Sequence, residues 1–148
     1  MKPQDMIELL TPPARSLNVQ YKIPASFTIA QCALETGWME SVKGNNLFGI
    51  KADSSWKGAV IIINTHECIN GKMVPKICQF RAYKTYLGSL EDHAQFLIKN
   101  ERYKSAFGSP NGLEFTKAVA KAGYATDPDY ANKIIGIILA HNLLSLDH

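Results

Sequence analysis

The chain has 148 residues, of which 46% are hydrophobic and 20% are charged, and its formal net charge is +3. This length and composition are typical of one globular domain and exclude a disordered tail or a coiled coil, so we expect residues 1–148 to form a single domain. Lysines and arginines are scattered along the chain, which argues against a nucleic-acid-binding patch and a nucleic-acid partner.

The sequence contains no apolar run long enough to span a bilayer. Its longest candidate, residues 134–146, is interrupted by His141 and Asn142. The first ten residues carry two acids and lack the apolar segment of a secretory signal. We therefore expect synthesis in the cytoplasm and no membrane insertion, and a protein acting outside the cytoplasm would need another route of export.

Helical signals dominate the N-terminal region. Thr11 and the proline after it resemble an N-cap and a first helical position, so a short helix over 3–10 and a new helix after residue 11 are predicted. Another helix is predicted over 23–38, ending at Gly37, a residue suited to a left-handed C-cap. Its apolar positions have the spacing of a buried helix face: Ile29, Ala30, Ala33 and Leu34.

Residues 58–80 have a different pattern, because β-branched runs lie on both sides of Asn70-Gly71. This dipeptide favours a two-residue type I′ turn, so the sequence predicts a β-hairpin. A lone hairpin is marginally stable in water, and we therefore expect it to lean on the helical body.

The three cysteines, Cys32, Cys68 and Cys78, lack the spacing of a zinc site. In the hairpin register Cys68 would face Met73, and Cys78 would face Ile63, so we expect free thiols rather than a Cys68–Cys78 bridge. His66 and His93 are further possible metal ligands, but they too lack zinc or facial-triad spacing. We therefore expect no metal and no cofactor.

Helices return after the hairpin. Thr85 and Asn111 can each cap a helix, and Asp127, followed by a proline, can cap a final helix over 128–145. The sequence therefore predicts a mainly α fold, formally α+β, with one β-hairpin.

Glu35 lies in the segment ALETGW, on the last turn of a predicted helix. The helix dipole disfavours an ionised carboxylate there, but by only about 0.3–1 kcal/mol. Burial would have to supply the rest of a raised pKa. A carboxyl kept protonated can act as the general acid of glycosidic bond cleavage, whereas the alternative is a solvated helix-end glutamate. The residues expected to bury it are Leu34, Trp38 and Phe48.

The loop KGNNLFGIKA, residues 43–52, gathers glycines and asparagines around two apolar residues. Asparagine offers donors and acceptors that suit sugar hydroxyls and acetamides, which makes Asn46 a candidate substrate contact. Aromatic rings are common platforms for sugars, so further candidates are Trp38, Phe48 and Trp56. The alternative is a structural turn with Phe48 and Trp56 in the core.

Glu67 is the second acid of interest. Strand alternation places Glu67 and Thr65 on one face of the hairpin. On a hairpin that folds over a cleft, this carboxylate could activate water or stabilise positive charge on the sugar. The alternative is a solvated strand glutamate.

The segment AGYATDPDYANK, residues 122–133, follows the helix that Asn111 is expected to cap. Tyr124 falls in a loop from which its hydroxyl could point into a cleft. Asp127 is best explained as a helix cap, with substrate contact as a second role. We interpret Tyr130 as a packing residue and His93 as a satisfied structural histidine.

Several segments taken in order resemble the glucosaminidase domain of glycoside hydrolase family 73: PASFTIAQCALETGW, GNNLFGIKA, THE, FRAYKTYLGSLEDHAQFL, RY and AGYATDPDYANKI. The resemblance covers about residues 10–140. It implies a lysozyme-like helical fold with a hairpin beside a substrate cleft. It also implies cleavage of the β-1,4 bond after N-acetylglucosamine in the glycan strands of peptidoglycan.

The resemblance also implies roles for individual residues. Glu35 corresponds to the general acid, Glu67 to the proposed second carboxylate, and Tyr124 to a residue that holds substrate or the transition state. The chain departs from the family pattern at Met39, where glycine is usual, and at the cysteine after Glu67. Neither departure removes a catalytic group.

On this basis we expect a monomeric, phage-type endolysin that acts on peptidoglycan in the periplasm or cell wall, delivered by a holin, a virion or a secretion system. A wall-remodelling hydrolase of a flagellum or secretion machine, and a non-catalytic glycan-binding module, stay open as alternatives. Carboxyls ~5–5.5 Å apart would favour retention and ~6.5–9.5 Å inversion, and the substrate's own acetamide offers a third route.

Overall fold

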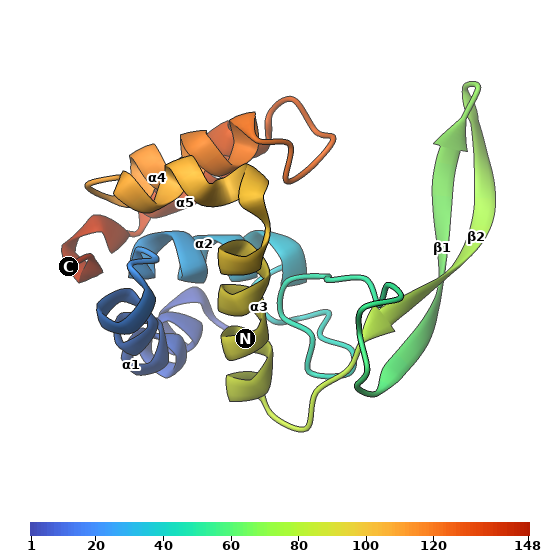
Figure 1. Cartoon of the computed structure of the whole chain (residues 1–148), viewed down its shortest axis with the longest axis horizontal. Helices are drawn as coiled ribbons and strands as arrows, with labels where there is room; N and C mark the ends of the chain where they lie inside the picture. The colour runs from blue at the N-terminus through green and yellow to red at the C-terminus, as the bar shows by residue number, and fades with distance from the viewer.

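The computed structural model describes the backbone of residues 1–148 and the side chains of all residues except Glu67 and Cys68. Figure 1 shows the helices gathered into one body, with the two strands projecting from it. The predicted mainly α fold with one β-hairpin is therefore confirmed. In chain order the elements are α1 (Pro3–Tyr21), α2 (Ala25–Thr36), β1 (Val60–Ile69), β2 (Lys72–Arg81), α3 (Tyr86–Lys99), the 3-10 helix η1 (Glu101–Gly108), α4 (Gly112–Lys121), α5 (Tyr130–Ala140) and the 3-10 helix η2 (Leu143–Leu146).

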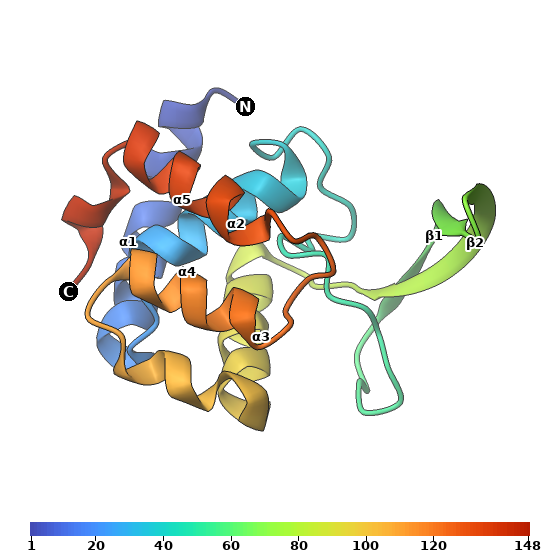
Figure 2. The ribbon, with the colours of Figure 1, turned by 90° about the horizontal axis from the view of Figure 1, so that it is seen from above.

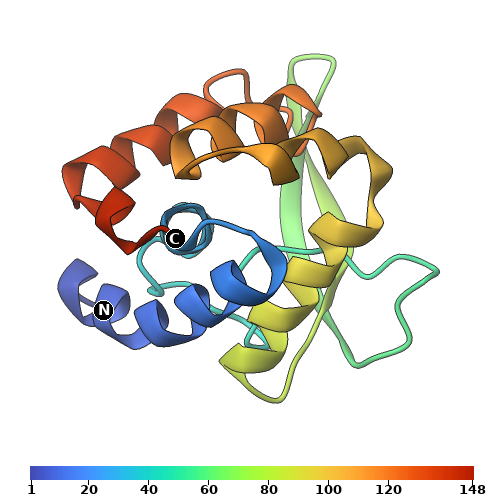
Figure 3. The same ribbon diagram turned by 60° about the vertical axis from the view of Figure 1, so that its left-hand side comes forward.

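The hydrophobic core is built around α2. Every residue of this helix from Ala25 to Ala33 is buried, and the helix contacts α1, α4 and α5. In Figure 3 the light-blue α2 is seen nearly end-on, with the other helices around it. Gly37 ends α2 in the left-handed conformation, as predicted, with φ of 57°. Glu35 therefore lies where the central helix leaves the core.

The predicted break at Thr11 is wrong, because α1 runs without interruption from Pro3 to Tyr21. The prolines at 12 and 13 lie inside the helix, and neither can donate to the carbonyl four residues earlier. Those carbonyls belong to Glu8 and Leu9, which are exposed. A buried stripe continues through the prolines and holds the helix to the core: Met6, Leu10, Ala14 and Leu17.

The caps predicted for the later helices are largely observed. The Thr85 side chain accepts the Gly88 N–H at 3.1 Å, and Asn111 accepts two N–H groups at the start of α4. The final helix is shorter than predicted, since Asp127 caps a turn before α5 and Asn142, with φ of 52°, follows its end. No helix among the described residues is both long and apolar enough to cross a bilayer.

The hairpin has the predicted register. Asn70 and Gly71 both have positive φ, as a type I′ turn requires, and the backbone of Cys68 pairs with that of Met73. Among the described side chains, Cys32 and Cys78 are free thiols. Figure 2 shows the strands extending away from the helices. The hairpin leans on the body only near its base, where residues 50–52 pair with β2 through backbone hydrogen bonds of 3.0 Å.

Candidate active site

Glu35 lies between two hollows of the surface. The first lies under the base of the hairpin, and its walls include Ile61, Ile63 and Phe80. The second extends toward Tyr124 and Phe96. Glu35 and Gly49 line both hollows, so the carboxyl stands at the middle of a groove that is open on either side.

A third hollow continues this groove. It shares Asp53 and Phe96 with the second hollow and reaches Trp56 and Lys99. The three hollows adjoin one another through shared lining residues, with the carboxyl of Glu35 between the first two.

The Glu35 carboxyl has the environment expected of an acid. The side chain is open to solvent on its groove side, while protein atoms on the other sides withdraw the carboxyl from water. This burial raises the pKa of Glu35, and a hydrogen bond from Tyr130 partly opposes the rise. Of the residues expected to bury it, Phe48 does line the second hollow, but the Trp38 ring packs edge-on against His141 at 4.8 Å.

Tyr130 is the site residue that sequence analysis missed. Its hydroxyl donates to Glu35 Oε1 at 3.0 Å and accepts from Gln31 Nε2 at 2.8 Å. The interpretation of Tyr130 as a packing residue is therefore incomplete. One signal was present in the sequence: Gln31 lies one helical turn before Glu35, on the same face of α2.

Tyr124 lies in the second hollow with Glu35. Its ring stacks on that of Tyr130, with centroids 5.8 Å apart and an interplanar angle of 17°. Phe96 and Tyr103 lie around the same ring. Burial raises the pKa of Tyr124, so its hydroxyl stays protonated and can act as a hydrogen-bond donor near the acid.

Asn46 is occupied in holding the loop. Its Nδ2 donates to the carbonyls of Ile50 and Arg81, and its Oδ1 accepts the N–H groups of Phe48 and Ile50. The residue lines the first hollow but is only 7% exposed. Its polar atoms therefore shape the wall of the groove by fixing residues 46–50.

Phe48 packs under the groove on His93. The two rings are stacked, with centroids 3.7 Å apart and an angle of 10°. Burial lowers the pKa of His93 to about 3, so the imidazole is neutral. We expected a satisfied histidine, but within the described protein atoms Nε2 of His93 has no hydrogen-bond partner.

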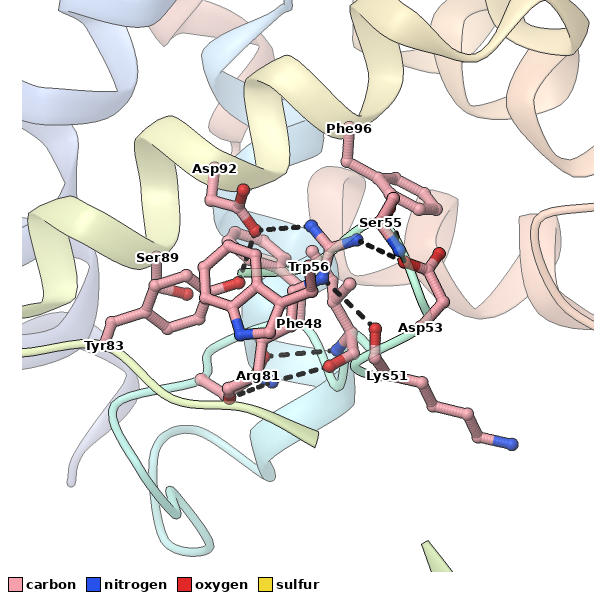
Figure 4. Close-up of polar contacts among 12 residues, drawn as sticks. Phe48, Lys51, Asp53, Ser55, Trp56, Arg81, Tyr83, Ser89, Asp92 and Phe96 are labelled. Atoms are coloured by element: carbon pink, nitrogen blue, oxygen red, sulfur yellow. Dashed lines mark hydrogen bonds and ion pairs between the residues drawn. The ribbon is translucent and has the colours of Figure 1, made fainter. Parts of the chain in front are cut away.

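Arg81 organises the third hollow, as Figure 4 shows. Its guanidinium bonds to Asp92 at 3.0 Å and to the Lys51 carbonyl at 3.2 Å. The same group lies 4.8 Å from the centroid of the Trp56 ring. Trp56 is thus half-buried at the groove wall, held by Arg81 and by a hydrogen bond from its Nε1 to the Ala59 carbonyl.

Asp127 and Glu67 are the two remaining candidates from the sequence. Asp127 accepts the Asp129 N–H at 2.9 Å and pairs with Lys133 at 2.5 Å, which accounts for it as a cap. Glu67 lies outside the described side chains, and its backbone pairs with Val74 in the hairpin. Among the described residues, no cluster of three or more His, Cys, Asp or Glu could hold a metal ion.

Comparison with known proteins identifies relatives along nearly the whole chain. The chain is 37% identical over 142 residues to the peptidoglycan hydrolase FlgJ of Salmonella typhimurium, and the match covers 91% of this chain and 45% of that protein. It is 37% identical over 152 residues to the exo-glucosaminidase LytG of Bacillus subtilis, covering 97% and 53%. The chain therefore spans about half the length of these curated relatives.

Solved structures give the same result. The C-terminally truncated glycoside hydrolase domain of Salmonella typhimurium FlgJ matches with a TM-score of 0.80 and 35% identity, covering 95% of this chain and 98% of that one. The catalytic domain of the Listeria monocytogenes autolysin Auto matches with a TM-score of 0.85 and 30% identity, covering 98% and 87%. The glucosaminidase family model, described as mannosyl-glycoprotein endo-beta-N-acetylglucosaminidase, matches residues 11–143. The chain belongs to the glucosaminidase family.

Proposed function

We propose that this chain is a peptidoglycan hydrolase that cleaves the β-1,4 bond after N-acetylglucosamine in the glycan strand. The observation that carries the proposal is the placement of Glu35, a carboxyl with a raised pKa, at the middle of an open groove. Its similarity to proteins named peptidoglycan hydrolase and exo-glucosaminidase supports the choice of polymer and bond.

In this proposal Glu35 is the general acid. It protonates the glycosidic oxygen as the bond from C1 of the sugar to that oxygen breaks. Water then adds to C1 and gives up a proton to a carboxylate of the site, which leaves a neutral sugar hydroxyl. Tyr124 lies in the same hollow with a protonated hydroxyl, and we assign it to holding the sugar during this step.

Glu67 is the proposed partner of Glu35, as base or as electrostatic stabiliser. Ile61 and Ile63 of β1 line the hollow that contains Glu35. Position 67 continues the same odd-numbered series along the strand, which supports the assignment. We leave retention, inversion and participation of the acetamide as the three routes that product stereochemistry would separate.

The shape of the groove supports internal cleavage rather than removal of terminal sugars. Hollows lie on both sides of Glu35, and the third hollow extends the groove past Asp53. A strand can therefore lie across the acid with sugars on each side. Trp56, at the wall of the third hollow, is the proposed contact for a distal part of the strand.

Two biological settings suit this activity. We infer a phage-type endolysin that acts on the wall as a monomer after delivery by a holin, virion or secretion system. The second candidate is a wall-remodelling hydrolase of a flagellum or secretion machine, favoured by the similarity to proteins named FlgJ.

Digestion of purified sacculi by wild type and Glu35→Gln tests the proposed function. Wild type should release fragments with reducing-end N-acetylglucosamine, detected by mass spectrometry, and Glu35→Gln should lose at least about 100-fold in rate. The matched control is Glu114→Gln, which changes an exposed glutamate on α4 and should keep full activity. Binding to sacculi without any released fragment, or near-normal activity of Glu35→Gln with its fold intact, would contradict the proposal.

A further inference from the structure

The two oxygens of the Glu35 carboxyl have different surroundings. Oε1 accepts the hydroxyl of Tyr130 at 3.0 Å. Oε2 lies toward Gly49. If residue 49 had a side chain, its Cβ would stand 3.5 Å from Oε2. Since Gly49 lines both hollows beside the acid, Oε2 is the oxygen on the groove side. Oε1 is directed at α5 and the helical body.

Gln31 determines how the Tyr130 hydroxyl is oriented. Its Nε2 donates to the phenol oxygen at 2.8 Å, so the single hydrogen of that hydroxyl is free to be directed at Glu35 Oε1. Gln31 is fully buried and Tyr130 is 6% exposed, so the bond between them is shielded from water, while the bond from Tyr130 to Glu35 is partly buried. The stacked ring of Tyr124 restrains Tyr130 on one side.

We propose that Tyr130 is the positioning residue of the acid: its hydroxyl occupies Oε1, so that Glu35 carries its proton on Oε2 and delivers it from there into the groove. The inference rests on the proposed function and adds the donating atom and the group that selects it. The proton passes from Oε2 to the glycosidic oxygen, which keeps the electron pair of the broken bond. The carboxylate that remains accepts a stronger hydrogen bond from Tyr130 than the neutral acid did.

Other ionisable groups also face this carboxyl. Lysines line both hollows, and the thiol of Cys32 lies on the same helix, with its pKa raised by burial to about 12. All of them are unchanged when only Tyr130 is substituted, so a difference between wild type and variant reports the Tyr130 hydrogen bond alone. Besides Tyr130 itself, the described groups are Cys32, Lys43, Lys51, Asp53 and Tyr124.

The test compares wild type with Tyr130→Phe by two readouts. The first is a carbon-13 NMR titration of the Glu35 carboxyl, which needs no substrate and therefore stands even if the chain hydrolyses nothing. The second is the pH dependence of sacculus digestion, which falls on the basic side as the acid ionises. Without its donor the ionised form is less stable, so the pKa and the basic limb should both move to higher pH by roughly one unit. KM should change little.

Two further variants keep the inference falsifiable. Tyr103→Phe removes another buried phenol hydroxyl, one that does not touch Glu35, and should leave the titration of Glu35 as in wild type. Gln31→Leu removes the anchor of the Tyr130 hydroxyl and should shift the pKa in the same direction by less. If Tyr130→Phe does not fold, Gln31→Leu alone decides. A Glu35 titration identical to wild type in the folded variants would overturn the proposal.

Discussion

The helical body buries its apolar residues, whereas the hairpin exposes several of its own. In the body, α2 is buried from Ala25 to Ala33. On the hairpin, Ile62, Met73 and Ile77 are 67%, 66% and 70% exposed. The body can therefore hold Glu35 and its partners in one geometry, because packing fixes the helix that carries them. The strands beyond the base of the hairpin have few such constraints. They form one wall of the groove but do not fix the position of Glu35.

The two regions are joined at the loop before the hairpin. Asn46 bonds to the carbonyls of Ile50 and Arg81, and so ties the loop to the last residue of β2. Arg81 returns to the body through Asp92 of α3. The geometry of the groove thus depends on a few buried polar contacts, whereas the fold of the body depends on apolar packing.

Removing the side chain at this joint should have the largest effect on stability. Asn46→Ala leaves buried backbone groups of Phe48, Ile50 and Arg81 without partners, and the expected loss is roughly 3 kcal/mol in the free energy of unfolding. Urea unfolding at neutral pH measures it. Activity should fall further than stability alone explains, because the hairpin base loses its tie to the loop beside Glu35.

Asn46→Asp is the matched control for this joint. It keeps the oxygen that accepts the N–H groups of Phe48 and Ile50 and loses the donor to the two carbonyls. If the ties to the hairpin base matter, this variant should lose activity like the alanine variant. Wild-type activity in Asn46→Asp would show that the joint acts only within the loop.

His93 offers a smaller, pH-dependent way to weaken the body. Its folded pKa of about 3 lies below the unfolded value of 6.5, so the unfolded chain takes up a proton that the folded chain refuses. Stability should therefore fall as the pH drops below about 6.5, by roughly 2 kcal/mol between pH 7 and 5. His93→Leu should lose that component, measured as the difference between the two urea series. Parallel pH curves for wild type and variant would refute this.

The sequence predicted local structure well where one residue decides the geometry. Asn70-Gly71 determined the hairpin register, and Thr85 and Asn111 capped their helices as expected. It failed where distant contacts decide. The predicted break at Thr11 was overridden by a buried stripe that continues across the prolines. The bond between Tyr130 and Glu35 joins residues 95 positions apart, and the local pattern, in which Gln31 marks a polar face beside Glu35, could not identify the tyrosine.

Substitutions on the hairpin should have the smallest effect on stability. Their effect on activity should depend on which face of the hairpin carries the side chain. The pairing of β1 with β2 separates Ile77 from the series that contains Ile63, and Ile63 lines the hollow beside Glu35. Ile77→Thr, on a residue that is 70% exposed, should change the free energy of unfolding by no more than about 0.5 kcal/mol and leave digestion of sacculi unchanged. Ile63→Thr makes the same chemical change on the groove side and should slow digestion by reducing apolar contact with the sugar. If both variants slow digestion equally, the hairpin contributes through its overall stability, and the claim that its groove-side face contacts the sugar is wrong.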